Sequence, residues 1–249
     1  MRQLFIDARS GAASDMLVDA LIGLGADEQY IADGVRALRL ESYPGSDASR
    51  EHESQHEHID ENGNVYVHKH NLRHRTFYDV KNIIGHAAID EEVKKTAVAI
   101  YTKIAAAEAE VHHSKRIMVE FHEVGRDRAI SQVVSFALAL QDLGLEPGVN
   151  MEAVATDIVD GKGTVMAAHG LMTVPVPAVR TMAEQNGFRI RQDDVPMEMI
   201  TPTGIGTIIG AGAKQISDEE FDELTRDLPY GVGKGTRDTG KPGLRIYLK

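Results

Sequence analysis

The sequence lacks cysteine and tryptophan, and aromatic residues make up only 5% of its 249 residues. Without cysteine the chain has no disulfide framework and no thiolate metal ligands. With so few aromatic side chains, a core of the size this length allows must consist mainly of Ala, Val, Ile, Leu and Met. No apolar run reaches the roughly 18 residues of a membrane span, and the chain does not start with a signal-peptide pattern. We therefore expect no membrane partner and, by default, a cytoplasmic location.

Positive charge is also scarce, because 27 Lys and Arg residues stand against 38 Asp and Glu residues. The resulting net charge of −11 argues against nucleic acid as a partner, since a nucleic-acid-binding face must be basic. It suits a protein that attracts cations. The sequence leaves homo-oligomerisation open.

Apolar segments with strand and helix spacing alternate along the chain, which predicts an α/β or mixed α+β fold with interleaved strands and helices. We expect strands at 4–6, 118–121, 151–160, 188–190 and 244–248, and helices at 14–24, 27–40, 77–86, 91–111, 129–140, 178–186, 202–209 and 219–227. Ser10 or Ser14 is a plausible N-cap of the first helix. A division into two subdomains is expected near the Glu146-Pro147-Gly148 turn.

A histidine-rich tract interrupts this pattern at residues 45–76. It contains six of the eleven histidines, namely His52, His56, His58, His68, His70 and His74. Asn62-Gly63 is a turn signal, so the tract predicts an exposed loop or hairpin. His68 and His70 would share one face of a strand, and His52 and His56 one face of a helical turn. Such pairs suit Ni²⁺, Zn²⁺ or Cu²⁺, and the alternative is a polar, pH-sensitive surface loop.

A second cluster of candidate ligands lies between the long helix and the turn at Gly125. It brings together His112, His113, Glu120, His122 and Glu123. Imidazole and carboxylate groups at this density can bind a metal or move protons. The alternative for the first two is a favourable position at the C-terminal end of a helix dipole.

Three loops could hold an anion. The first runs from Asp7 to Asp15 through Ser10 and Gly11, where a strand gives way to a helix whose backbone N–H groups favour anions. Thr201 opens a later helix, and a glycine-rich basic segment carries Lys234 near the C-terminus. The alternatives are ordinary capping loops and an edge hairpin.

Several stretches, taken in order, resemble the nickel insertion proteins of nickel-pincer cofactor biosynthesis, the LarC family. They are Leu4–Met16, Ala107–His112, Phe121-His122-Glu123-Val124-Gly125, His169-Gly170 with Val174–Ala178, and Thr201-Pro202-Thr203-Gly204. The match covers most of the chain outside residues 40–100, and it corresponds to the N-terminal part of the family only. The chain departs from the family pattern at Arg9, Ser14, Glu120, Arg126–Gln132 and Val179-Arg180.

The resemblance implies a lyase-type nickel chelatase that inserts nickel into pyridinium-3,5-bisthiocarboxylic acid mononucleotide. It implies CTP with Mg²⁺, bound by a C-terminal domain that the matched part of the family does not include. Either a separate polypeptide supplies that domain, or this protein has a reduced function. The catalytic residues would be Glu123, His122 and Asp15. The metal ligands would be His112, His122, Glu123 and His169, with the six histidines of the tract collecting nickel. The substrate and its phosphate would contact Ser10, Gly11, Thr201, Thr203, Gly204 and Lys234.

Two other functions compete with this one. The chain could be a diverged metal-storage protein or metallochaperone that binds metal through its histidines alone. It could also be an unrelated enzyme that acts on a nucleotide or organic phosphate through its glycine-containing loops.

Overall fold

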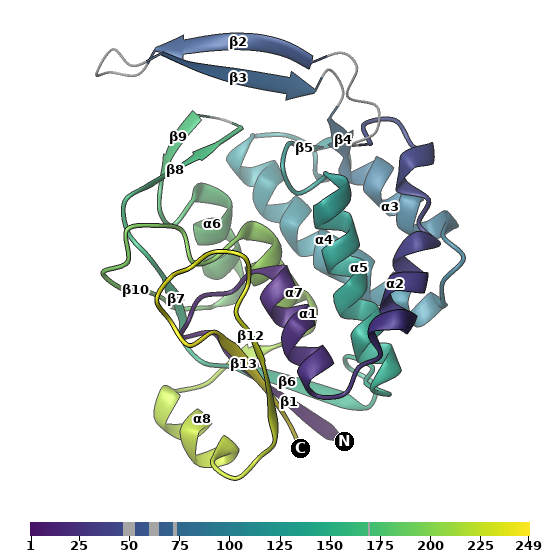
Figure 1. Ribbon diagram of the computed structural model, residues 1–249, viewed down its shortest axis with the longest axis vertical. Coiled ribbons are helices and arrows are strands. Elements are labelled where there is room, and N and C mark those ends of the chain that lie inside the picture. The colour runs from purple at the N-terminus through teal and green to yellow at the C-terminus, as the bar shows by residue number, and fades with distance from the viewer. Residues whose placement is uncertain (47–52, 60–64, 72–73, 169) are drawn as a thin grey trace.

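A computed structural model describes the backbone of residues 1–46, 53–59, 65–71, 74–168 and 170–249, and their side chains except in 53–59 and 65–71. Its largest sheet has five strands in the order β11-β6-β1-β13-β12 (Figure 1). These strands are β1 (Arg2–Asp7), β6 (Met151–Ala155), β11 (Lys214–Gln215), β12 (Tyr230–Gly233) and β13 (Leu244–Leu248). The sheet therefore contains β1 from the N-terminal end and β12 and β13 from the C-terminal end, and β6 and β11 come from the chain between them.

β1 is the central strand, parallel to β6 and antiparallel to β13. Its side chains alternate between the two faces of the sheet, as the pleat requires. Leu4 and Ile6 are buried in the main core, whereas Phe5 belongs to a small cluster with Phe221 and Tyr247. Phe221 lies on helix α8 (Asp218–Thr225), so α8 covers the face of the sheet away from the main core.

The other face is covered by a layer of helices (Figure 1). They are α1 (Ser14–Gly23), α2 (Glu28–Arg36), α3 (Phe77–His86), α4 (Glu91–Val111), α5 (Asp127–Asp142), α6 (Pro177–Asn186) and α7 (Pro202–Gly210). The long helix α4 packs against α3, α5, α6 and α7. Glycine permits the closest of these contacts, because a Cβ at Gly206 or Gly210 of α7 would lie 2.5 Å from a side-chain or backbone carbon of α4.

The described residues also form short two-stranded sheets. The pairs are β4 (Arg75–Thr76) with β5 (Glu120–Phe121), β7 (Ile158–Asp160) with β10 (Ile190–Gln192), β8 (Thr164–Ala167) with β9 (Gly170–Thr173), and β2 (Glu53–Ile59) with β3 (Val65–Asn71). Single 3-10 turns occur at Leu40–Ser42 and Arg116–Met118. Residues 122–125, which follow β5, form a turn that is here called the His122 turn. Because β4 pairs with β5, the end of the histidine-rich tract lies beside the start of this turn.

The mixed α/β class is confirmed, and the helices at 77–86 and 91–111 have the predicted bounds. The hairpin predicted in the histidine-rich tract is present as β2 and β3, but its exposure, its turn and the side chains of its histidines lie outside the described residues. The helical turn expected around His56 is wrong, because residues 53–59 form a strand.

Three local predictions also need correction. The N-cap of α1 is Ala13, not Ser10 or Ser14, because the chain turns at Gly11, forms a bridge from Ala12 to Ile200 and becomes helical only after the extended Ala13. Residues 151–160 form two strands in different sheets, since the chain leaves β6 at Thr156. The strand predicted at 118–121 begins only at Glu120, after a 3-10 turn.

Segments on both sides of the 146–150 turn share the five-stranded sheet and one hydrophobic core. The proposed division of the chain there stays a prediction. Among the described residues no helix is long and apolar enough to cross a membrane.

Candidate functional site

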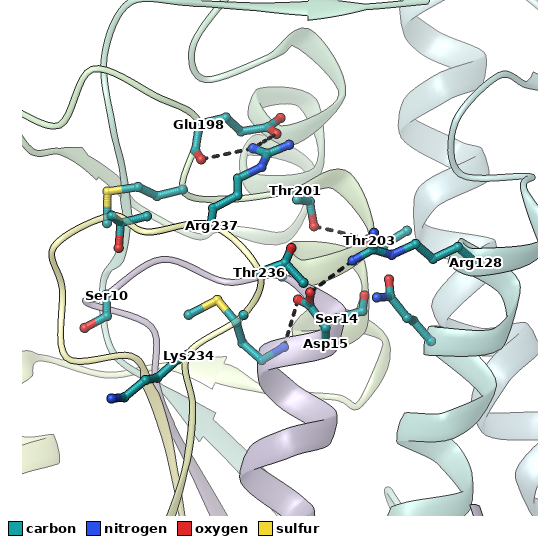
Figure 2. Close-up of a pocket in the computed structure, with 16 residues that line it drawn as sticks. Ser10, Ser14, Asp15, Arg128, Glu198, Thr201, Thr203, Lys234, Thr236 and Arg237 are labelled. Atoms are coloured by element: carbon teal, nitrogen blue, oxygen red, sulfur yellow. Dashed lines mark hydrogen bonds and ion pairs between the residues drawn. The ribbon is translucent and has the colours of Figure 1, made fainter. Parts of the chain in front are cut away.

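Two adjoining cavities lie where the helices and short sheets meet. The larger, here called the histidine cavity, has a volume of about 760 Å³ and is lined from the end of α4, the His122 turn and the β8–β9 hairpin. The smaller, here called the helix-start cavity, has a volume of about 220 Å³ and lies at the starts of α1 and α7 (Figure 2). Arg128, Glu198 and Arg237 line both cavities, so the two are continuous.

Three imidazoles stand in a row, and two of them, His112 and His122, line the histidine cavity. His112 ends α4, His122 follows β5, and His74 precedes β4. The ring centroids of His74 and His122 are 4.3 Å apart, and those of His112 and His122 are 5.8 Å apart. The pairing of β4 with β5 explains why His74 lies here rather than with the rest of the histidine-rich tract.

Two carboxylates accompany the imidazoles. Glu108 lies one helical turn before His112, with 3.4 Å between its Oε2 and Nε2 of the histidine. Burial, together with the nearby charge of Glu123, raises the pKa of Glu108 to about 7. Glu123 itself accepts a hydrogen bond of 3.2 Å from the backbone N–H of Ala168, at the tip of the β8–β9 hairpin. Both carboxylates therefore line the same cavity as His112 and His122.

The β8–β9 hairpin gives the histidine cavity an apolar wall. Val165, Met166 and Met172 line the cavity from this hairpin, and Val176 and Ala178 line it from the start of α6. His169, a predicted metal ligand, lies outside the described residues. An apolar wall beside a polar cluster suits a ligand that carries a flat ring as well as charged groups.

No group of three His, Asp or Glu side chains in the described part of the chain is arranged to hold a metal ion. The predicted ligands His112, His122 and Glu123 line one cavity, but they do not converge on one point. The side chains of His52, His56, His58, His68 and His70 are outside the described residues. The backbone register pairs position 56 with 68 and position 54 with 70, which places residues 56, 58, 68 and 70 on the same face of the β2–β3 hairpin.

Two ion pairs stand at the helix-start cavity. Arg128 Nη2 lies 3.4 Å from Asp15 Oδ2, and Figure 2 shows the Arg128 side chain reaching from α5 toward the start of α1. Arg237 Nη1 lies 2.7 Å from Glu198 Oε2. Burial raises the pKa of Glu198, and Arg237 opposes that rise. The family resemblance placed Asp15 among the catalytic residues. In the structure Asp15 lines the helix-start cavity and not the histidine cavity.

Four of the residues expected to hold a phosphate line the helix-start cavity: Ser10, Thr201, Thr203 and Lys234. Gly11 and Gly204 serve a different purpose in the described structure, which is close packing. A Cβ at Gly11 would lie 2.5 Å from the carbonyl oxygen of Met199, and one at Gly204 would lie 2.1 Å from that of Ala12. These glycines let the loop before α1 and the loop before α7 form one wall of the cavity.

Sequence motifs did not indicate Glu108, His74 as a neighbour of His122, or Arg237, and they marked Arg128 only as a departure from the family pattern. Glu108 could have been found, because it stands four residues before His112 on a helix and so faces the same way. Arg237 could not, because its position depends on how distant loops meet. In contrast, His113 and Glu120 are exposed and are not among the residues that line either cavity.

Asp160 holds the loop that carries Glu198 and Thr201. Its Oδ1 accepts hydrogen bonds from the backbone N–H groups of Gly161, Met199 and Ile200 at 2.8, 2.7 and 3.1 Å. Asp160→Ala should lower the free energy of unfolding by about 3 kcal/mol or more, because three buried donors lose their acceptor. Urea unfolding measures this loss.

Asp160→Asn is the matched control, because it keeps an acceptor oxygen without the charge. Burial raises the pKa of Asp160 above its ordinary value of 3.8. The unfolded chain therefore ionises first, and the parent protein should lose stability as pH rises through 3.8 toward the raised pKa. The Asn variant should lack this dependence. Equal losses in the Ala and Asn variants would contradict the acceptor role.

The protein thus has a mixed α/β fold in which a cavity lined by imidazoles and carboxylates adjoins a cavity that suits an anion. The family model described as "Nickel insertion protein" matches residues 4–249, and the chain belongs to that family. The family resemblance drawn from the sequence motifs is thereby confirmed. No solved structure matches the chain at a significant level.

Curated relatives support the same assignment. The pyridinium-3,5-bisthiocarboxylic acid mononucleotide nickel insertion protein of Alkaliphilus metalliredigens is 31% identical over 99% of this chain and 60% of its own length. The protein of that name from Desulfitobacterium hafniense is 32% identical over 98% of this chain and 57% of its own length. The one from Lactiplantibacillus plantarum is 31% identical over 96% of this chain and 59% of its own length. The chain thus spans about three fifths of the length of these relatives.

Proposed function

We propose that this protein inserts nickel into a pyridinium bisthiocarboxylate mononucleotide, with the chemistry in the histidine cavity. The observation that carries the proposal is the row of His74, His122 and His112 beside Glu108 and Glu123, in a chain of the nickel insertion family. The names of the relatives support the substrate.

In this proposal His112 and His122 bind the incoming Ni²⁺ reversibly through imidazole nitrogen, a ligand type that suits nickel. The side chains must rotate toward one another, because no three of the described ligands converge on one point. The thiocarboxylate sulfurs of the substrate are softer ligands, so the metal passes to them. A nickel–carbon bond replaces a ring C–H bond, and Glu123 or His122 accepts the proton that is released.

His74 gives the histidine-rich tract a connection to this cavity. It lies at the point where the chain leaves the tract, and its ring packs against that of His122 at an interplanar angle of 55°. We propose that the tract collects nickel, and that His74 receives it before His122. His169, which lies outside the described residues, would add a further ligand.

We further propose that nickel insertion consumes CTP with Mg²⁺, as the family resemblance implies. Nickel insertion that goes to completion without CTP would overturn this part of the proposal.

Metal storage is a second candidate function, and the β2–β3 hairpin favours it. The backbone register places four histidine positions on one face of that hairpin, which is a possible metal-binding arrangement that needs no cavity. Storage would require the histidines alone.

Replacing His56, His58, His68 and His70 by glutamine separates the two functions. For nickel insertion, calorimetry should show fewer Ni²⁺ ions bound per chain and one remaining tight site. For storage, all binding should disappear. Substitution is preferable to deletion of residues 50–76, because such a deletion would remove Arg75, whose side chain is buried and makes four hydrogen bonds. Loss of all nickel binding in this variant would contradict the proposed insertion site.

A further inference from the structure

The side chain of Ser14 is an unusual feature of the helix-start cavity. Ser14 is only 1% exposed and lines the cavity, and its hydroxyl oxygen has no hydrogen-bond partner in the described structure. A buried polar atom without a partner costs about 1–3 kcal/mol, so such atoms are rare unless something else satisfies them. A ligand in the cavity would be in position to do so.

Two helix starts point to the charge of that ligand. Ser14 is the first residue of α1, a helix of 10 residues whose N-cap, Ala13, makes no capping side-chain hydrogen bond. Helix α7, with 9 residues, starts beside it, and its Thr201 and Thr203 hydroxyls line the cavity 3.2 Å apart. The N–H of Met16 donates to Asp15 Oδ1 and that of Gly204 to Thr201 Oγ1. The remaining N–H groups at the two starts, together with the helix dipoles, favour anions.

The charged side chains agree with this preference. Arg128, Lys234 and Arg237 line the cavity with only Asp15 and Glu198 as acids, which is a local excess of positive charge in a chain of net charge −11. Each acid is already paired with an arginine. In Figure 2 Arg128 reaches from α5 toward the start of α1, whereas the Arg237 side chain extends toward Glu198.

Size restricts the ligand further. The helix-start cavity, at about 220 Å³, is smaller than the roughly 300–1,000 Å³ of pockets for drug-sized ligands, whereas the histidine cavity, at about 760 Å³, is within that range. Because Arg128 and Arg237 line both, one ligand could place a small anionic group in the first and a ring in the second.

We infer that the helix-start cavity binds the phosphate monoester of a mononucleotide whose ring lies in the histidine cavity. The assignment of the ring rests on the proposed function, but the phosphate site does not. Ser14 and Arg128 are its specificity-determining residues: the hydroxyl donates to a phosphate oxygen, and the guanidinium exchanges Asp15 for the more highly charged phosphate.

The test uses the whole chain with a chelator present, so that nickel plays no part. Calorimetry compares inorganic phosphate, nicotinate mononucleotide and nicotinate riboside, which lacks the phosphate. The mononucleotide should bind at least about tenfold more tightly than the riboside, a difference of about 1.4 kcal/mol. Equal affinities would overturn the inference.

Two variants localise the effect. Arg128→Gln should weaken mononucleotide binding by about tenfold or more without changing riboside binding, since it removes a positive charge and leaves Asp15 unneutralised. Arg36→Gln is the matched control, because it makes the same charge change at an exposed residue of α2 that lines neither cavity. Inorganic phosphate should bind this control as it binds the parent.

Ser14→Ala gives a sharper test, because stability and binding should move in opposite directions. Removing a buried hydroxyl that has no partner should raise the unfolding midpoint of the ligand-free protein. The same change should weaken mononucleotide binding by about fivefold to tenfold, since hydrogen bonds to charged groups are the stronger ones. A variant that binds the mononucleotide as tightly as the parent would contradict the role of Ser14.

A further titration with CTP distinguishes a mononucleotide from a nucleoside triphosphate as the source of the phosphate. Arg128-dependent binding of CTP without binding of nicotinate mononucleotide would overturn the assignment to the mononucleotide. The outcome for nickel is independent: if the phosphate results hold but His122-dependent nickel binding is absent, the proposed function fails and the phosphate site stands.

Discussion

His122→Ala should weaken nickel binding at the histidine cavity by about 100-fold or more. Changes that only disturb the neighbours of metal ligands already cost about 10–100-fold in affinity, and His122 is proposed as a ligand itself. It is also the middle ring of the row, in contact with both His74 and His112. Its loss should therefore interrupt both the cavity site and the connection to the histidine-rich tract.

The measurement is a calorimetric Ni²⁺ titration in the variant that lacks His56, His58, His68 and His70. In that background only the tighter site remains, so its loss is easy to see. His86→Ala is the matched control, because His86 is an exposed histidine of α3 outside the histidine cavity, with a ring nitrogen 2.8 Å from the carbonyl oxygen of Asn82. If His122→Ala and His86→Ala bind nickel equally well, the histidine cavity is not the nickel site.

Arg75→Ala should lower the free energy of unfolding by about 3–5 kcal/mol, which is the usual cost of breaking a buried ion pair. The Arg75 side chain is 2% exposed, and its Nη1 lies 2.6 Å from Oδ1 of Asp127. It also donates to the backbone carbonyl groups of Leu40, Pro44 and Gly125. A typical domain has only about 5–15 kcal/mol of stability, so the loss is a large part of the total.

The same substitution should affect nickel binding, because Gly125 ends the turn that carries His122 and Glu123. Urea unfolding gives the stability, and the Ni²⁺ titration at a concentration where the protein stays folded gives the second effect. Arg75→Lys should restore only part of the stability, since an ammonium group cannot reproduce the planar set of guanidinium donors.

Arg36→Ala is the control for the ion pair. Arg36 pairs with Asp33 on α2, but its side chain is 66% exposed, and such surface pairs contribute about 0–1 kcal/mol. Comparable losses at Arg75 and Arg36 would contradict the structural role assigned to Arg75.

Local patterns in the sequence predicted most of the elements well. The apolar spacing of α4 and the Thr201-Pro202 start of α7 are properties of neighbouring residues, so they can be read without the fold. The start of α1 was predicted less well, because the chain before it stays extended through backbone bonds with residues near Met199. Those partners are far away in sequence.

The candidate site likewise contains some residues that local sequence predicted and others that only the fold brings together. His112, His122 and Glu123 were identified as a group because a short segment connects them. His74 joins them only because β4 pairs with β5, and Arg128 and Arg237 meet only because α5 and the C-terminal loop reach the same place. Likewise, the order β11-β6-β1-β13-β12 depends on pairing between the two ends of the chain.

By itself the sequence determined the class of fold, the candidate ligand types and the family. These follow from composition, periodicity and short motifs, which are local. Tertiary structure alone decided that candidate metal ligands and residues expected to hold a phosphate line two continuous cavities, and that Ser14 is buried at the start of α1. The physical reason is that cavities and burial arise from the packing of distant segments, here allowed by glycines such as Gly11 and Gly204 at points where a Cβ would clash.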